Sequence, residues 1–378
     1  MCGVFHEALE ESEETMAKPL YEEEFIFDPQ IEDHGHVHAS CIVECPNGDL
    51  RAVWYENGRE LPPPYYSERR DKSDDVRIGG SRKPIGADSW EKPFVMSDTF
   101  GVSNNNPCMA IDRRGHLWLV HATLLGVPRW TWGSALLRYK ISSRYDRPGP
   151  PIWDRENILV PRIAELEEMA SEGNPLSSRL GWMPRAHPLI RSDGAVVIPL
   201  ANENFYIAAM AITQDSGETW TFSKPVPGRG VIQPTLVEFP DGTITAFFRT
   251  SGGRIRRSDS LDGGITWSQM REIDLIHPGS GLEAILLRNG HLLMIYNDKE
   301  DARDRLAVSI STDRGRTWRW TRHLEDTPGE RFDYPSIIQA RDDTLHATYT
   351  YNLRTIKHVH FNEEWVMEED EGESEEGV

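Results

Sequence analysis

Apolar stretches recur along this chain, and in six places a tight turn joins two of them into a predicted β-hairpin. Each hairpin begins with a polar residue, often followed by Pro, and continues as an apolar strand, a turn and a second apolar strand. Asn-Gly and Asp-Gly turns supply the positive φ angles that a short hairpin connection requires. The six turns lie at Asn47-Gly48, Arg114-Gly115, Asp193-Gly194, Asp241-Gly242, Asn289-Gly290 and Asp342-Asp343.

A second pattern, Ser/Thr-x-Asp-x-Gly-x-Thr-Trp, occurs three times, at residues 213–220, 260–267 and 311–318. Its Asp and hydroxyl side chains can hydrogen-bond the backbone of their own turn, and its Gly supplies a positive φ angle. The Trp then starts the outgoing strand and can pack against the neighbouring sheet. We therefore predict a structural turn in each copy, and degenerate copies at 81–90 and 142–153.

The spacing of the turns predicts an all-β fold, a six-bladed β-propeller with four-stranded blades. The last four hairpin turns lie 48, 48 and 53 residues apart, which suits one four-stranded blade each, and insertions near 56–74 and 143–181 lengthen the first two intervals. The apolar stretch Phe25-Ile26-Phe27 is expected to supply the outer strand of the last blade and close the ring. Residues 161–171 have helical periodicity and predict a short helix within the second insertion.

The Ser/Thr-x-Asp-x-Gly-x-Thr-Trp copies resemble the Asp-box (BNR) repeat of the sialidase superfamily. Four further segments, 185–188, 232–235, 280–283 and 334–336, resemble a bacterial exo-sialidase-like branch, and the resemblance covers about residues 22–362. It implies a glycoside hydrolase, an exo-glycosidase that hydrolyses a terminal acidic sugar from an oligosaccharide or glycoconjugate. No cofactor and no metal are expected.

In a propeller the hairpin turns and the Asp boxes lie on one face, so the starts of the inner strands meet on the other, where a pocket forms at the axis. The resemblance implies arginines that hold a carboxylate there, a Tyr–Glu nucleophile pair and an acidic residue as acid/base. The candidate substrate-binding residues are Arg185, Arg249, Arg354, Arg59, Gln233 and Asn106. The candidate catalytic residues are Glu283 with Tyr351 or Tyr334 as the nucleophile pair, Asp75 or Glu60 as acid/base, and His187.

One motif departs from the sialidase pattern. Sialidases usually open the first blade with Arg-Ile-Pro, and this chain has His38-Ala39-Ser40-Cys41. Arg59, in the long loop of that blade, is the candidate to replace the missing arginine.

Two alternatives remain open. The first is a polysaccharide lyase or another glycosidase acting on uronate- or rhamnose-containing glycans, and the lyase needs the same carboxylate clamp and a base such as His187 or a tyrosine. A non-catalytic glycan-binding propeller would bind without turnover.

The net charge of −20 is concentrated at the two ends. Residues 1–34 hold 11 acidic residues and one Lys, and residues 363–378 hold 9 acidic residues and no basic one. We predict a flexible acidic segment at 1–21, the propeller at 22–362 and a disordered acidic tail at 363–378. The remaining body is nearly neutral, so an acidic glycan is compatible with it, and nothing favours nucleic acid.

The chain is expected to be cytoplasmic, because glutamates occupy the N-terminal region where a signal peptide would be basic and then apolar. No apolar stretch is long enough to predict a membrane span. Its four cysteines, Cys2, Cys41, Cys45 and Cys108, have no metal-binding spacing and are expected to be free thiols.

Overall fold

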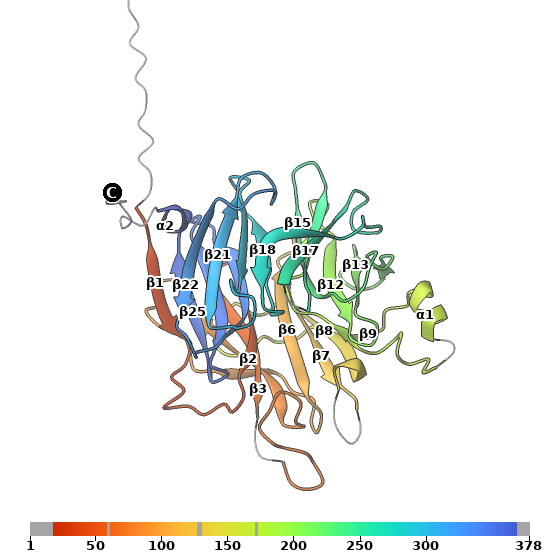
Figure 1. Cartoon of the computed structure of the whole chain (residues 1–378). Helices are drawn as coiled ribbons and strands as arrows, with labels where there is room; N and C mark the ends of the chain where they lie inside the picture. Colours follow the sequence, from red (N-terminus) through yellow and green to blue (C-terminus); the bar gives the residue numbers. More distant parts are fainter. Residues whose placement is uncertain (1–17, 59–60, 127–130, 171–172, 252, 369–378) are drawn as a thin grey trace, which may run out of the picture.

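The computed structural model describes residues 18–58, 61–126, 131–170, 173–251 and 253–368, and their strands form six sheets (Figure 1). Blade 1 comprises β2 (His38–Glu44), β3 (Leu50–Asn57), β4 (Val76–Lys83) and β5 (Phe94–Ser97), and blade 2 comprises β6 (Asn104–Ile111), β7 (Leu117–Leu124), β8 (Ala135–Ser142) and β9 (Arg155–Leu159). Blade 3 comprises β10 (Trp182–Met183), β11 (Leu189–Ile190), β12 (Val196–Asn202), β13 (Ile207–Thr213) and β14 (Thr221–Phe222). Blade 4 comprises β15 (Ile232–Glu238), β16 (Ile244–Arg249), β17 (Gly253–Ser260) and β18 (Arg271–His277).

Blade 5 comprises β19 (Glu283–Leu286), β20 (Leu292–Tyr296), β21 (Arg305–Ser311) and β22 (Trp320–Asp326). Blade 6 comprises β23 (Phe332–Gln339), β24 (Leu345–Tyr351), β25 (Thr355–Phe361) and β1 (Tyr21–Phe25). The helices are α1 (Ala164–Ala170), α2 (Glu363–Met367) and the 3-10 helix η1 (Trp132–Ser134). The first strands of neighbouring blades contact each other, so they are the inner strands of the ring. The predicted six-bladed β-propeller is therefore confirmed.

The ring is closed by the N-terminal strand. β1 pairs antiparallel with β25, from Tyr21 opposite Phe361 to Phe25 opposite Lys357. The strand predicted at Phe25-Ile26-Phe27 thus lies a few residues earlier, and Ile26 makes one further backbone bond, to Ile356. Blade 6 consequently contains both ends of the described chain.

The turns form as predicted. In five hairpins a Gly with positive φ, and in the sixth Asp343 at 70°, closes the turn. In the Asp box of blade 4, Asp262 Oδ1 accepts from Thr266 N at 2.9 Å and from Ser260 Oγ at 2.9 Å. The same bonds recur in the other two boxes. The Trp of each box packs on a neighbouring blade, as Trp318 does against Phe247, so the boxes join adjacent blades.

The C-terminal region differs from the prediction. Residues Glu363–Met367 form helix α2, whereas a disordered tail was predicted from residue 363. The helix forms because the Asn362 side chain accepts from Trp365 N and Val366 is buried. The predicted helix at 161–171 is confirmed as α1. No helix in the described part of the chain is long and apolar enough to span a bilayer.

Four inner strands share a β-bulge near their first residues, in β2, β6, β15 and β23. In each bulge one non-glycine residue takes a left-handed conformation: Ala39 at φ 57°, Asn106 at 49°, Gln233 at 51° and Tyr334 at 50°. This conformation is costly for residues with a Cβ atom, and bulges redirect side chains beside functional sites. The bulges mark this end of the inner strands as the place to look for chemistry.

Blade 3 has a larger irregularity. Its inner position is divided between β10 and β11, which both pair with β12. The residues between them include Arg185 and His187, which therefore lie outside the ladder and beside the inner strands of other blades.

Candidate active site

Tyr334, Gln233 and Arg249 meet at the bulged end of the inner strands. Arg249 Nη1 donates to Tyr334 Oη at 2.7 Å, and Gln233 Nε2 donates to the same oxygen at 3.1 Å. Arg249 Nη1 also donates to Gln233 Oε1 at 3.1 Å. Because the phenolic oxygen accepts from two donors, one of them a cation, negative charge that develops on it is stabilised.

Arg185 supports Tyr334 from the interior. Its guanidinium carbon lies 5.2 Å from the centroid of the Tyr334 ring, and its Nη2 donates to the Pro335 carbonyl. Arg185 is only 2% exposed, and among the described residues its Nε and Nη1 have no hydrogen-bond partner. Burial lowers its pKa, although an arginine remains charged at neutral pH. Arg185 is therefore a buried cation that packs against the tyrosine.

Glu283 pairs with His187. Glu283 Oε1 accepts from both the backbone N and Nδ1 of His187 at 2.8 Å, and its Oε2 accepts from Ile337 N at 3.0 Å. Burial alone would raise the pKa of Glu283, but His187 and Arg185 lower it overall. Burial likewise opposes the charge of His187, but Cys41 and Glu283 raise its pKa well above the usual value. The two residues form a buried ion pair.

On the other side of Tyr334 lie a neutral histidine and a second ion cluster. The ring of His38 lies edge-on to Tyr334 at a centroid distance of 4.3 Å, and burial lowers the pKa of His38 well below its usual value. Asp333, fully buried, bonds Arg303 Nη1 at 2.5 Å and also the Nε of Arg331. Burial opposes the charge of Asp333, but the neighbouring cations Arg303 and Arg331 lower its pKa overall.

Two carboxylates near this group have no hydrogen-bond or ion-pair partner in the described part of the chain. Glu203 follows β12, and burial raises its pKa although Arg249 and Lys72 oppose that effect. Asp71 lies in the long loop of blade 1. Its charge adds to burial in raising the pKa of Tyr55, and it opposes the lowering of the His36 pKa by burial. A carboxyl group with a raised pKa is better suited to donate its proton to a leaving group, and of these two carboxylates Glu203 has the raised pKa.

The structure brings together six of the residues singled out in the sequence: Glu283, His187, Arg185, Arg249, Gln233 and Tyr334. It does not place Glu283 in hydrogen-bond contact with Tyr334, because Glu283 is turned to His187. Gln233 bonds the tyrosine instead. Asn106 lies at the corresponding bulge of blade 2.

Three other candidates lie apart from Tyr334. Tyr351 packs against Phe332 and Phe25 of its own blade. Arg354 is exposed. With the Gly35 backbone N–H and Arg69, it lowers the pKa of Asp33. Asp75 accepts from the Asn57 side chain at 3.1 Å. The predicted Arg59 and Glu60 lie outside the described residues.

Sequence reasoning missed several members of this group: Asp71, Arg303, Arg331 and Asp333. The bulges explain part of this, because a bulge directs two successive residues such as Asp333 and Tyr334 toward the same end of the strand. In three of the bulges the left-handed residue is followed by Pro, as Asn-Pro, Gln-Pro and Tyr-Pro, and this pair is the sequence signal that marks the bulge. In the described residues no group of three or more His, Cys, Asp or Glu side chains is arranged to hold a metal ion.

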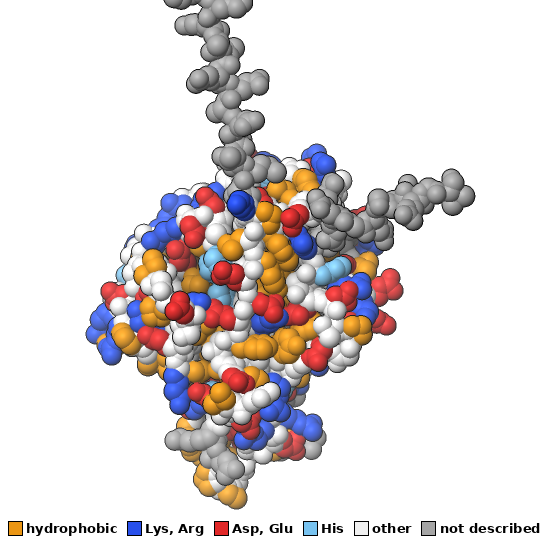
Figure 2. Space-filling model, turned by 90° about the vertical axis from the view of Figure 1, so that its left-hand side faces the viewer, with side chains coloured by type: hydrophobic (Ala, Val, Ile, Leu, Met, Phe, Trp, Pro, Cys, Tyr) orange, Lys and Arg blue, Asp and Glu red, His pale blue; other side chains and the backbone are white. Residues whose placement is uncertain are grey.

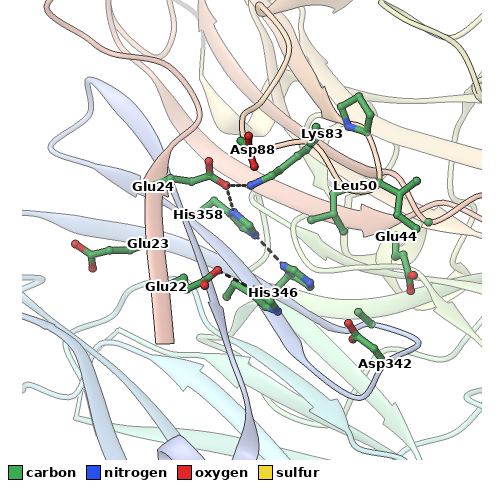
Figure 3. A pocket seen from close by; sticks show the side chains of 17 residues that line it. Glu22, Glu23, Glu24, Glu44, Leu50, Lys83, Asp88, Asp342, His346 and His358 are labelled. Atoms are coloured by element: carbon green, nitrogen blue, oxygen red, sulfur yellow. Dashed lines mark hydrogen bonds and ion pairs between the residues drawn. The ribbon is translucent and has the colours of Figure 1, made fainter. Parts of the chain in front are cut away.

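A separate groove of about 560 Å³ lies between the outer parts of blades 6 and 1, and none of its lining residues belongs to the group around Tyr334. On the face that carries β1, histidine side chains are visible among acidic ones (Figure 2). In the groove His346 Nδ1 lies 3.0 Å from His358 Nε2, and His358 contacts Glu24 (Figure 3). His346 also stacks on His360 at a centroid distance of 4.3 Å. Burial lowers the pKa of His346 to about 3 and that of His358 below its usual value.

This histidine stack predicts acid-sensitive stability. The folded pKa values of His346 and His358 lie below the unfolded value near 6.5, so the unfolded chain takes up more protons as pH falls below 6.5. The free energy of unfolding should therefore fall as pH decreases toward 3, by up to about 1.4 kcal/mol per pH unit for each histidine. A His346→Phe variant keeps the ring and should show a shallower slope in urea unfolding. His323→Gln, at a more exposed site, should keep the wild-type slope, and equal slopes for all three proteins would contradict the assignment.

Comparison with known proteins supports the fold and the superfamily. The sialidase of Paraclostridium sordellii is 24% identical over 207 residues, which cover 51% of this chain and 49% of the relative. This chain therefore matches about half the length of that curated relative. The solved structure of a Hadza microbial sialidase gives a TM-score of 0.71 at 16% identity over 91% of this chain and 69% of its own. A protein of unknown function from Dyadobacter fermentans gives 0.70 at 17% identity, over 90% of this chain and 98% of its own.

The family assignment rests on a longer match. Residues 59–347 match the BNR repeat-like domain family, and this range contains all three Asp boxes. It also includes Gln233, Arg249 and Tyr334. The chain belongs to the BNR repeat-like domain family of the sialidase superfamily.

Proposed function

We propose that this protein is a sialidase-like exo-glycosidase that hydrolyses a terminal acidic sugar, with Tyr334 as the nucleophile. The observation that carries the proposal is the contact of Tyr334 Oη with Arg249 and Gln233 at the bulged end of the inner strands. The curated relatives named as sialidases support the reaction class.

A tyrosine nucleophile suits an anionic substrate, because the neutral hydroxyl is not repelled by the sugar carboxylate as a carboxylate nucleophile would be. Arg249 and Arg185 place positive charge beside the Tyr334 ring and stabilise the charge that develops on its oxygen. Glu203 is the proposed general acid for the leaving oxygen, because its pKa is raised and it has no competing partner in the described structure.

Arg249 and Arg331 are the proposed ligands of the sugar carboxylate. Arg331 is half exposed and bonds Asp333 through Nε, which leaves its two terminal nitrogens for a ligand. Arg303 adds positive charge on the same side. A guanidinium binds a carboxylate through two parallel hydrogen bonds. Arg185, which the sequence also suggests for this role, is 2% exposed and packs on the Tyr334 ring, so we assign it to the support of Tyr334.

The test is turnover of 4-methylumbelliferyl sialic acid by the purified chain. Arg249→Ala should reduce kcat/KM by about a hundredfold, because it removes one charge-assisted carboxylate contact and one donor to Tyr334. Arg254→Ala removes an exposed arginine of the same blade, which pairs with Asp274, and should leave turnover unchanged. Equal activity of the two variants would remove Arg249 from the site.

A specific observation keeps the lyase as a second candidate. Neutral His38 lies against Tyr334, and the hydroxyl bonds an amide, not a carboxylate. A lyase requires a neutral base or a tyrosine to remove the proton next to a carboxylate. Ultraviolet absorbance that rises with a uronate oligosaccharide, without release from the sialic acid substrate, would identify elimination. Saturable binding without either signal would indicate a glycan-binding propeller.

A further inference from the structure

A groove between blades 4 and 5 lies apart from the group around Tyr334. It has a volume of about 530 Å³, and residues from the Asp boxes of both blades line it. Within blade 4, Arg249 pairs with Ile232 at the bulged end of β15. Ser260, where the Asp box begins, pairs with Ile244 at the other end of β16. The groove, which we call the Asp-box groove, therefore lies at the opposite end of the blades from the candidate active site.

The lining of the Asp-box groove is rich in positive charge. Among the described residues that line it, four are arginines: Arg257, Arg271, Arg314 and Arg316. The lining contains one carboxylate, that of Asp259. Its Oδ1 accepts from Arg257 Nη2 at 2.7 Å and its Oδ2 accepts from Arg271 Nη2 at 2.8 Å. Two of the arginines thus share a single carboxylate.

The other two arginines leave positive charge unbalanced. Arg314 pairs with Asp241, which does not line the groove, at 2.6 Å. The side chain of Arg316 is exposed and has no hydrogen-bond or ion-pair partner in the described part of the chain. Even with Asp241 included, four arginines face two carboxylates. An anion that enters the groove would balance the remaining charge.

Two of the arginines are held in place before any ligand arrives. The guanidinium of Arg257 lies 5.5 Å from the ring of Phe247, and that of Arg314 lies 4.8 Å from the ring of Phe239. Arg257 Nη1 also donates to the Arg314 carbonyl at 2.7 Å, so the two blades are tied together here. Side chains that are already ordered lose less conformational entropy when they bind a ligand.

The equivalent place between blades 2 and 3 is neutralised within the protein. Arg155 is the first residue of β9, as Arg271 is of β18, and it pairs with Glu218 of the next Asp box. In the box of blade 5 the position of Glu218 is taken by Arg316. The turn does not require this arginine, because the bonds of the box are made by Ser311, Asp313 and the backbone and hydroxyl of Thr317. The charge reversal therefore points to a ligand and not to the fold.

The size and chemistry of the groove indicate which anion it fits. Its volume falls within the range of about 300–1,000 Å³ that is usual for small-molecule sites, and it is larger than an inorganic ion needs. A guanidinium binds a carboxylate through two parallel hydrogen bonds. Between the arginines the lining offers the hydroxyl residues Thr243 and Ser268 and the apolar side chain of Leu261, which is 84% exposed. Carboxylates, hydroxyls and small apolar faces occur together in acidic sugars.

We propose that the Asp-box groove binds an acidic oligosaccharide, whose carboxylates contact Arg271 and Arg316. The assignment of the ligand as a glycan rests on the proposed function. A glycan bound in this groove stays attached to the protein without occupying the site at Tyr334, so the protein engages its substrate at two separate places.

The experiment measures binding of a hexamer of galacturonic acid by isothermal titration calorimetry. The full chain carries Arg249→Ala, so that the candidate active site contributes little to the signal. Arg271→Gln and Arg316→Gln should each raise the Kd by about tenfold, because each removes a charge-assisted contact. The matched control is Arg319→Gln, which changes an exposed arginine of the same blade that stacks on Trp320 and does not line the groove. It should leave the Kd unchanged.

Several results would overturn the inference. Absence of binding, or equal Kd values for Arg271→Gln, Arg316→Gln and Arg319→Gln, would exclude the groove as the site. A glutamate hexamer that binds more tightly than the galacturonate hexamer would assign the groove to an acidic peptide, and inorganic phosphate that binds as tightly would assign it to a small anion. In the otherwise unchanged chain, Arg316→Gln should keep full turnover of 4-methylumbelliferyl sialic acid. A failure of the proposed function would therefore appear in the turnover assay, and a failure of this inference in the binding assay.

Discussion

A Tyr334→Phe variant is expected to lose turnover of an activated sialic acid substrate by at least about a thousandfold in kcat. The change removes only the oxygen that accepts from Arg249 and Gln233, and leaves the ring that packs against Arg185 and His38. Because the carboxylate ligands stay in place, KM should change by much less than kcat. Steady-state kinetics with the fluorogenic substrate give both parameters.

Tyr351→Phe is the matched control. Tyr351 is the other tyrosine that the sequence suggests, and it packs against Phe25 and Phe332 of its own blade. Its loss of one hydroxyl should leave kcat unchanged. If Tyr351→Phe were inactive and Tyr334→Phe active, the proposed nucleophile would be wrong. If both were active, a tyrosine nucleophile would be excluded.

A Glu283→Gln variant should be less stable by about 3–5 kcal/mol, because it leaves two buried cations, Arg185 and His187, without their shared anion. The free energy of unfolding in urea measures this. Because the pKa of Glu283 is lowered in the folded protein, its contribution to the free energy of unfolding is present above about pH 4.5 and is lost as the pH falls. The raised pKa of His187 means that its contribution is present below 6.5 and is lost as pH rises through the folded value. The difference in free energy of unfolding between wild type and variant should therefore be largest between about pH 4.5 and pH 6.5.

The control for that variant is Glu156→Gln. Glu156 is 40% exposed and pairs with Arg138 and Lys140 on the outside of blade 2. Exposed ion pairs of this kind contribute at most about 1 kcal/mol. If Glu283→Gln also lost less than about 1 kcal/mol, Glu283 would not be the anion that stabilises Arg185 and His187.

The fold was predictable because its signals are local. A hairpin turn and an Asp box each need only a few neighbouring residues, such as Ser260, Asp262 and Thr266, whose side chains bond the turn that they lie in. Repetition of these turns then fixes the number of blades. The helix at Glu363–Met367 was missed because a run of acidic residues hides the cap at Asn362.

The pairing of site residues was not predictable, because it depends on backbone irregularities. Glu283 was expected beside a tyrosine, but the break in the inner strand of blade 3 brings His187 to it instead. Tyr334 and Tyr351 are both at strand ends near the same face, and only the bulge in β23 separates their roles. Gln233 and Arg249 could be listed as candidates, but their contact with Tyr334 from two blades away is a property of the closed ring.

Closure by β1 has a consequence for how the molecule is made. β1 and its partner β25 lie far apart in the sequence, and the bond from Leu20 to Asn362 joins residues 342 positions apart. Contacts this distant in sequence carry a large loop-closure cost and form late. Until β1 and β25 pair, the ring stays open and each of these strands has an unpaired edge. Unpaired strand edges pair readily with other chains, so the protein is most prone to aggregation before this last pair forms, and a chaperone that covers these edges would protect it.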